Sequence, residues 1–305
     1  MIATIAAQQV TVLRRQQVVI SLLALMLLMT VIAGVLGWSS HRTVLGVYDQ
    51  ATTLLAGRGD PVPPNPISLK PSLSLLANME VYVPMVGALL ALLIGHLSIV
   101  DDVASGVGRL VFSRPIDRRS YLAGKILAAS GVLLALAALS CVVGILSVTA
   151  VNAALPTGGE VARIAAFYSV SWLYLVVFAL VGMITVVAIG RRPISLLTAL
   201  GVWLVITFVL PQVTSGQRPT ASLNPVVEPT TTSQAFFRAT SWLRPISLVE
   251  QYKTASAQLL EIGSPGQTTA TIVHVIPIAL AVIVASATAF ITISRNDVSK
   301  GTIRD

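Results

Sequence analysis

Six long apolar stretches constrain this chain more than any other feature of its sequence. They are 18–38, 81–100, 122–151, 164–189, 193–213 and 271–294. An α-helix needs roughly 20 apolar residues to cross the hydrocarbon core of a bilayer, which is about 30 Å thick. Each stretch is too long for an ordinary strand and lacks the strict alternation of a membrane β-barrel strand. The sequence therefore predicts an all-α integral membrane protein with six transmembrane helices.

Composition agrees with this prediction and excludes several functions. Hydrophobic residues make up 55% of the chain and charged residues 10%, which is more apolar surface than a soluble core can bury. The single cysteine, Cys141, can form no disulfide within the chain. We find no Cys/His metal spacing, no Gly-x-Ser-x-Gly and no phosphate loop of the Gly-x4-Gly-Lys-Ser/Thr form. We therefore expect no enzyme activity and no cofactor in this chain, and any ATP and Mg²⁺ to be bound by another chain.

The charges between the stretches predict an orientation. If both termini are cytoplasmic, the cytoplasmic segments hold twelve Lys and Arg against five Asp, and the outer segments hold eight Lys and Arg against seven acidic residues. This asymmetry follows the positive-inside rule. We expect a multi-pass protein of a bacterial inner membrane with both termini in the cytoplasm. The net charge of +8 then reflects topology, and nucleic acid is not an expected partner.

Three segments outside the stretches carry patterns of their own. Residues 1–17 have an apolar stripe near helical spacing, which predicts an interfacial elbow helix against lipid, with a frayed tail as the alternative. The segment 39–80 contains a predicted helix that ends before a run of prolines. The segment 214–270 contains an amphipathic piece interrupted at Pro245. We expect both longer segments to cap the outer end of a single domain spanning 1–305, where a further partner stays open.

The spans are informative by what they lack. Counting the third span from Ile126, no Asp, Glu, Lys or Arg lies inside the six stretches. Lys125 lies about a turn into 122–151, where its long side chain can snorkel to the interface. A charge at the bilayer centre costs about 2.5–3.5 kcal/mol and usually marks an ion or proton pathway. The absence of charged residues from the six stretches argues against a secondary carrier.

A ridge of small residues lies on the second stretch. Gly87, Ala91 and Gly95 recur at intervals of four residues, which places them on one helix face. Such a ridge permits close approach of two helix backbones. The approaching helix is either a neighbouring span of the same chain or a span of a second subunit, and the sequence favours neither.

The loop after the second stretch concentrates charge. The segment 100–125 carries eight of the chain's 32 charged residues. Apolar residues at Val103, Val107, Leu110 and Val111 predict a helical stripe within it. Asp101 and Asp102 near the start of this helix, and Arg109 near its end, suit the helix macrodipole if a helix restarts near Val100. Pro115 then ends the helix, and Arg114, Arg118 and Arg119 flank that end.

The stretch 99–125 resembles the signature region of ABC transporter permeases of the type V exporter (ABC-2-like) family, a group that includes the permease of the nitrous oxide reductase maturation system. Family members carry an acidic residue, a Gly-Thr-Leu-like step, Leu-Leu-Ser-x-Pro-Val-Ser-Arg and a Gly-Lys that opens the next span. This chain has Asp101-Asp102, Gly108-Arg109-Leu110, Val111-Phe112-Ser113-Arg114-Pro115-Ile116-Asp117-Arg118 and Gly124-Lys125. It departs from the pattern in carrying Asp for the usual Glu, and Arg109 for the Thr. The segment 242–248 and the six-span layout also resemble the family.

The resemblance implies a function. It implies that 100–119 contains a coupling helix that docks on a cytoplasmic ABC ATPase, present in two copies beside a second permease copy. The implied contacts are Asp101, Asp102, Arg109, Arg114, Pro115 and Arg118. The tight turn that carries Arg191 and Arg192 is a second candidate contact by its position alone. We expect export, since no importer-type binding-protein signal is visible. The alternatives are a scaffold or sensor that binds a cytoplasmic partner without transport and, less favoured, a secondary carrier or channel.

Overall fold

The computed structural model describes residues 2–58, 61, 64–65, 71–104, 117–215, 235–262 and 271–295. Within these residues the chain forms helices and no strands. Six helical segments are long and apolar enough to cross a membrane: Gln17–Arg58, Met79–Asp102, Arg118–Asn152, Gly158–Ile189, Arg192–Thr214 and Thr271–Arg295. Each contains one of the six predicted stretches. The prediction of an all-α membrane protein with six spans is therefore confirmed.

The helices follow one another along the chain. Their bounds are α1 Ile2–Arg15, α2 Gln17–Arg58, η1 Ser72–Leu76, α3 Met79–Tyr82, η2 Val83–Gly87, α4 Ala88–Ala104, α6 Arg118–Asn152, α7 Gly158–Ile189, α8 Arg192–Leu204, η3 Val205–Val209, α9 Leu210–Ser215, α10 Ala235–Thr240, η5 Ser241–Ile246, α11 Leu248–Leu259 and α12 Thr271–Arg295. The second span is built from α3, η2 and α4, and the fifth from α8, η3 and α9.

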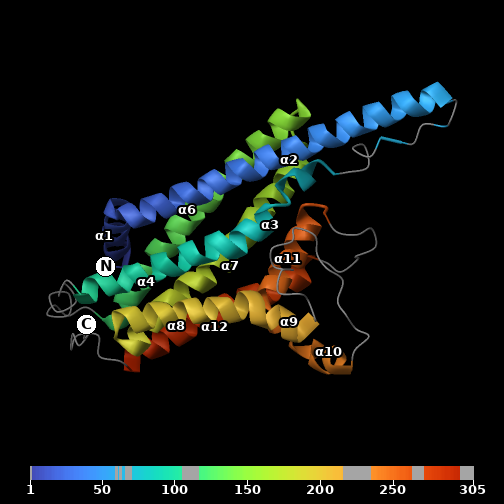
Figure 1. The fold of residues 1–305 in the computed structure, drawn as a ribbon. Helices are drawn as coiled ribbons and strands as arrows, with labels where there is room; N and C mark the ends of the chain where they lie inside the picture. The colour runs from blue at the N-terminus through green and yellow to red at the C-terminus, as the bar shows by residue number, and fades with distance from the viewer. Residues whose placement is uncertain are drawn as a thin grey trace.

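The spans form one bundle with two distinct ends (Figure 1). We call the end that holds α1 and the last residues of α12 the α1 end, and the opposite end, where α11 lies, the α11 end. The central helix is α7, which contacts α4, α6, α8, α11 and α12. Its side chains include the fully buried Phe167, Tyr174 and Phe178. The core of the molecule is therefore organised around α7.

Local sequence signals fix both ends of α7. The Thr157 hydroxyl accepts a hydrogen bond from the Glu160 amide at 3.3 Å, and the Glu160 carboxylate accepts one from the Thr157 amide at 2.7 Å. This capping box satisfies two backbone donors that have no partner within the helix. At the other end Gly190 adopts φ 68°, a left-handed conformation that glycine adopts without strain, and the helix stops.

The first span is longer than predicted. The stretch 18–38 and the helix expected within 39–80 form a single helix, α2, of 42 residues. At 1.5 Å per residue it is about 63 Å long, roughly twice the thickness of the hydrocarbon core. No proline interrupts the sequence between Trp38 and Arg58, so nothing breaks the helix where the apolar run ends. α2 accordingly projects beyond the bundle at the α11 end (Figure 1).

Two spans contain a π-helical turn, and a hydrogen bond links these spans close to the turns. Val83–Gly87 interrupts the second span and Val205–Val209 interrupts the fifth. The Trp203 indole donates a hydrogen bond to the Pro84 carbonyl at 3.1 Å, which links the fifth span to the turn in the second. Pro84 has no amide hydrogen for the helix ladder, which accounts for the irregular turn there. π-Helical turns of this kind often occur at functional positions.

One prediction about the spans is wrong. Among the Asp, Glu, Lys and Arg side chains of the described spans, two are buried: Glu80, fully buried in α3, and Lys125, 3% exposed in α6. Glu80 lies one residue before the predicted stretch, in the segment expected to lie outside the membrane. Lys125 does not snorkel, because polar side chains of α1 and α4 reach it inside the bundle. The presence of both charges removes one argument against a secondary carrier.

Candidate functional site

The residues singled out by the charged loop lie at the α1 end of the bundle. Asp101 and Asp102 are in the last turn of α4, and Arg118 opens α6. They flank the segment 105–116, so the predicted contacts Arg109, Arg114 and Pro115, and the helix predicted there, lie outside the described residues. Asp101 and Asp102 end α4 instead of starting a new helix near Val100. The negative end of the helix macrodipole disfavours carboxylates there, so both need partners.

Asp102 joins the end of α4 to the beginning of α6. Its carboxylate accepts a hydrogen bond from the Tyr121 hydroxyl at 2.8 Å and pairs with the Lys125 ammonium at 2.5 Å. Tyr121 and Lys125 are buried, and the Asp102 side chain is 18% exposed. A charge-assisted contact of this kind is strong when water is largely excluded. The two ends of the charged loop are thus held together by one carboxylate.

The helix α1 braces the same pair of elements. The Gln9 side-chain carbonyl accepts a hydrogen bond from Lys125, and the Gln16 side-chain amide donates one to Asp101. α1 also packs closely on α6, since a side chain at Gly124 would meet the side chain of Ile5 at 2.7 Å. The position of α1 is therefore coupled to both ends of the loop.

The turn between α7 and α8 reaches Asp101 from another side. The Arg192 guanidinium lies 3.4 Å from the Asp101 carboxylate. Gly190 ends α7, Arg191 is extended, and Pro193 in the first turn of α8 starts the new helix. This geometry brings the predicted second contact next to the first. We call Asp101, Asp102, Arg192, Tyr121, Lys125, Gln9 and Gln16 the α1-end network.

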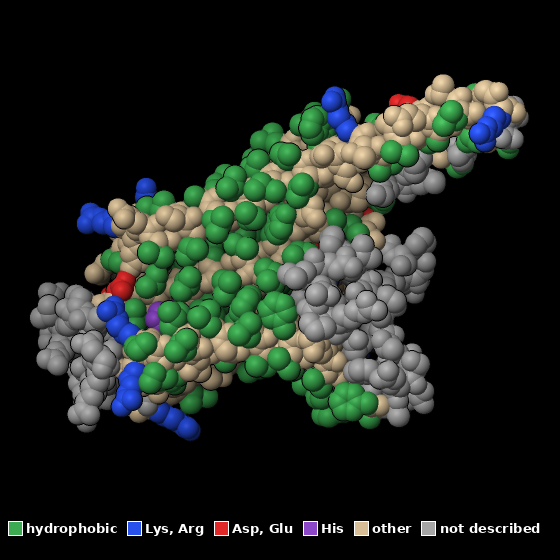
Figure 2. All heavy atoms as spheres, viewed as in Figure 1, with side chains coloured by type: hydrophobic (Ala, Val, Ile, Leu, Met, Phe, Trp, Pro, Cys, Tyr) green, Lys and Arg blue, Asp and Glu red, His purple; other side chains and the backbone are tan. Residues whose placement is uncertain are grey.

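The surface around this network is basic. Arginine side chains exposed there are Arg14, Arg15, Arg119, Arg191, Arg192 and Arg295, while Arg118 is half-buried. Figure 2 shows Lys and Arg side chains gathered at this end, whereas hydrophobic side chains cover the middle of the bundle. Because the carboxylates of Asp101 and Asp102 are engaged within the chain, this end presents mainly positive charge. Across the described ranges no group of His, Cys, Asp and Glu could hold a metal ion.

The small-residue ridge faces a helix of the same chain. A side chain built at Gly95 would overlap the Ala179 carbonyl oxygen of α7, and one at Gly182 would overlap the Leu92 carbonyl oxygen. Ala91 is fully buried on the same helix face. Gly87 lies against Leu175 of α7 and a methionine of α2. α4 and α7 therefore approach each other backbone to backbone.

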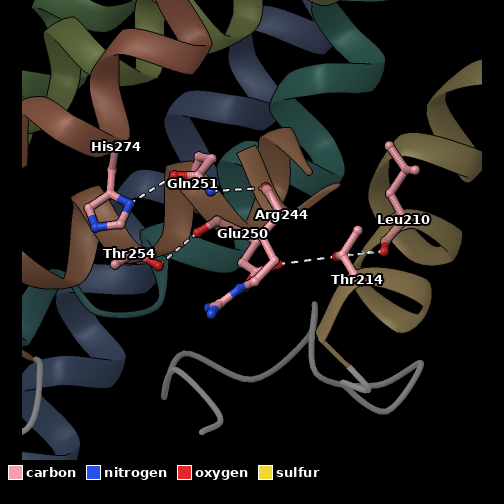
Figure 3. A network of polar contacts seen from close by, with 7 residues as sticks. All are labelled: Leu210, Thr214, Arg244, Glu250, Gln251, Thr254 and His274. Atoms are coloured by element: carbon pink, nitrogen blue, oxygen red, sulfur yellow. Dashed lines mark hydrogen bonds and ion pairs between the residues drawn. The ribbon is translucent and has the colours of Figure 1, made fainter. Parts of the chain in front are cut away.

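A second polar network lies at the α11 end. Glu250 pairs with Arg244 at 2.8 Å and accepts a hydrogen bond from Thr214 at 3.3 Å. The Gln251 side chain is 2.8 Å from the His274 ring, and its amide donates to the Arg244 carbonyl at 3.0 Å (Figure 3). The sequence-based predictions missed this network. Its one signal in the sequence is a short amphipathic helix, which does not reveal the partners of its polar side chains.

The fold and the α1-end network define a class: a multi-pass helical membrane protein whose charged loop is clamped at both ends by its own spans. A family model described as ABC-2 family transporter protein matches residues 3–297, which is nearly the whole chain. The chain therefore belongs to the ABC-2 family transporter proteins, a family of membrane subunits that pair with a cytoplasmic ATPase. It matches no curated protein.

Proposed function

We propose that this chain is the permease subunit of an ABC exporter and that a separate ATPase drives it through the segment 100–119. The family match supports the permease assignment. The α1-end network supports the route of coupling, because any movement of the loop acts on both of its anchored ends at once. The observation that carries the proposal is the contact of Asp102 with Tyr121 and Lys125, which joins α4 to α6.

The α1-end network connects the loop mechanically to several helices. ATP-driven closure of two ATPase subunits moves whatever is docked on them, and the docked segment here is tied to α4 and α6. Asp101 extends the connection to α8 through Arg192 and to α1 through Gln16. Four elements then move together, and the central α7 follows α4 because their backbones are in direct contact. We infer that Asp101 and Asp102 act chiefly by positioning the loop.

The arginines at the α1 end are the proposed ATPase contacts. Arg118, Arg191 and Arg192 lie beside the loop, and Arg109 and Arg114 belong to the loop itself. The charge asymmetry favours a cytoplasmic location in a bacterial cell for this end and both termini, with the α11 end outside. Two permease copies over two ATPase copies complete the transporter, with ATP and Mg²⁺ bound by the ATPase. The closer likeness to the nitrous oxide reductase maturation permease stays a prediction.

Co-purification with a partner tests this function. Each ABC ATPase of the source organism that lacks spans of its own is co-expressed with the tagged chain, and complexes are recovered in detergent. We expect one ATPase to co-purify and its turnover to change on binding. Arg191→Glu should weaken recovery about tenfold, since reversing one rim charge at an interface costs about 1.4 kcal/mol or more. The matched control is Arg42→Glu on α2, which should not affect recovery.

The outcome separates the candidate functions. Recovery of an ATPase whose turnover responds to the permease in proteoliposomes supports the exporter. Stable binding of a cytoplasmic protein that hydrolyses no ATP favours the scaffold or sensor. Failure to recover any ATPase contradicts the proposal.

A further inference from the structure

The helix α1 has a buried face and an exposed face. Its buried side chains are Ala6, Gln9 and Leu13, which lie three to four residues apart and so share one side of the helix. α1 packs on α6 and also contacts α2 and α4. Arg14 and Arg15, in its last turn, are exposed. Figure 1 shows α1 lying across the direction of the spans at the α1 end. The two arginines therefore lie outside the helix contacts that hold α1 in place.

Arg14 and Arg15 carry charges that the described part of the chain does not compensate. The first acidic residue of the sequence is Asp49, where α2 continues past its apolar run. Within the described residues, neither Arg14 nor Arg15 forms an ion pair. Arg192 at the same end of the bundle differs, because it pairs with Asp101. The last turn of α1 thus presents two positive charges to its surroundings.

The position of these arginines along the chain places them at the membrane surface. The apolar run of α2 begins at Val18, three residues after Arg15. Val18 and Ile20 are 58% and 50% exposed, so these apolar side chains face lipid. Three residues reach at most about 11 Å even when extended. Arginines so close to the hydrocarbon lie among the phospholipid headgroups, where an anionic headgroup offers the opposite charge.

Two side chains of α1 connect this helix to both ends of the charged loop. Gln16, directly after Arg15, donates a hydrogen bond to Asp101 at the end of α4. Gln9 accepts a hydrogen bond from Lys125 near the beginning of α6. Gln9 and Lys125 are both buried, so this hydrogen bond is formed away from water, where it is stronger. A shift of α1 therefore acts on both sides of the loop.

We propose that Arg14 and Arg15 bind the headgroups of anionic phospholipids, and that α1 transmits this binding to the two anchored ends of the charged loop. An arginine near an anionic membrane surface gains about fivefold in affinity, so the two together gain about 25-fold. This preference favours the arrangement in which α1 lies against the membrane surface. The lipid contact is independent of the proposed function, whereas its effect on an ATPase rests on that function.

Hydrogen exchange in nanodiscs tests the lipid contact without an ATPase. The full chain is placed in nanodiscs of phosphatidylcholine alone, or of equal parts phosphatidylcholine and phosphatidylglycerol. We expect phosphatidylglycerol to slow exchange in α1 about tenfold and to slow exchange at 99–104 and 118–125 as well. Arg14→Gln with Arg15→Gln should remove all of these differences. The matched control is Arg42→Gln with Arg58→Gln on the projecting part of α2, which removes the same charge and should keep them.

A change at Gln16 separates lipid binding from its transmission. Gln16→Ala removes the hydrogen bond to Asp101 and leaves both arginines in place. Phosphatidylglycerol should still slow exchange in α1 of this variant. Exchange at 99–104 should no longer respond, whereas exchange at 118–125 should still respond through Gln9 and Lys125. A full response at 99–104 in the variant would overturn the proposed route of transmission.

Three outcomes would overturn the lipid contact. One is equal exchange of α1 in the two kinds of nanodisc. The second is an unchanged response to phosphatidylglycerol after Arg14→Gln with Arg15→Gln. The third is the same protection of α1 by inorganic phosphate in phosphatidylcholine nanodiscs, which would make this a site for soluble anions. If the double variant fails to fold, the single changes decide, and each should leave about a threefold difference.

ATPase turnover separates this inference from the proposed function. Once an ATPase co-purifies with the chain, phosphatidylglycerol should change its turnover about tenfold in proteoliposomes of the parent, and not in those of the double arginine variant. If α1 responds to the lipid while turnover does not, the lipid contact stands and coupling through the loop fails. If the ATPase is coupled to the chain but α1 ignores the lipid, the proposed function stands and this inference fails.

Discussion

The carboxylate of Asp102 at the end of α4 lies 2.8 Å from the hydroxyl of Tyr121 in α6. The same carboxylate pairs with Lys125, one turn further along α6. The loop between these helices is thereby anchored on both sides. A loop held in this way transmits a displacement to its helices in place of absorbing it. Three features can each be tested: the contacts of Asp102 with α6, the helix packing that carries the displacement, and the orientation of the bundle.

Asp102→Asn should destabilise the protein strongly. The change leaves the Lys125 charge buried with Gln9 as its one remaining strong partner, and unpaired buried charges cost about 3–5 kcal/mol. Tyr121→Phe removes one hydrogen bond and keeps the charge pair, so it should cost only about 1 kcal/mol. Thermal unfolding in detergent, followed by loss of monomer on gel filtration, measures both. Equal unfolding midpoints for Asp102→Asn and the parent would show that the Asp102 contacts contribute nothing to stability.

Gly95→Ala should separate α4 from α7. The added methyl group would overlap the Ala179 carbonyl oxygen, which requires the two backbones to move apart. We expect a lower unfolding midpoint and less folded protein, because close approach through small residues stabilises membrane helix pairs. Gly131→Ala on α6 is the matched control, since nothing lies within 4 Å of that position. If both changes have the same effect, the α4–α7 contact is looser than described.

Trp203→Phe should loosen both π-helical turns. It keeps most of the apolar contact and removes the hydrogen bond to the Pro84 carbonyl, a loss of about 1 kcal/mol. Hydrogen exchange should then increase at 83–87 and 205–209 together, because the bond joins α8, just before the turn 205–209, to the turn 83–87. Exchange that rises only around residue 203 would show that the turns are independent.

The charge asymmetry predicts which end faces the cytoplasm. In a Cys141→Ala background, Gly46→Cys should react with an impermeant maleimide added to intact cells, and Arg191→Cys should react only after the membrane that holds the protein is opened. The physical reason is the excess of Lys and Arg in the short loops at the α1 end, which resist translocation. The reverse pattern would place the charged loop outside the cell and exclude an ATPase partner there.

Much of the fold is readable from the sequence because the bilayer imposes a simple rule. Each apolar stretch of sufficient length becomes a span, and this holds for all six. The ends are less well defined, because apolarity does not stop a helix. α2 continues for about 20 residues past its apolar run, and α3 starts before the second stretch with Glu80 inside the protein. A span boundary drawn from hydropathy therefore hides buried charges near helix ends.

Sequence-based prediction reaches a similar limit at the candidate site. Sequence patterns locate Asp101, Asp102, Arg118, Arg191 and Arg192, and the structure places all five at one end of the bundle. Their partners include glutamines of α1 and a tyrosine of α6, which no local pattern connects to these carboxylates. Pairing across the bundle depends on how α1 folds back, and that follows from tertiary packing.

Site-specific cross-linking at the loop tests the central claim most directly. A photoreactive amino acid is placed at Arg109 in the assembled, membrane-embedded complex, and at Arg42 on α2 as the control. The coupling proposal predicts an ATPase adduct from position 109 and none from position 42. It is contradicted if position 109 gives no ATPase adduct while the ATPase is present and active in the same membranes.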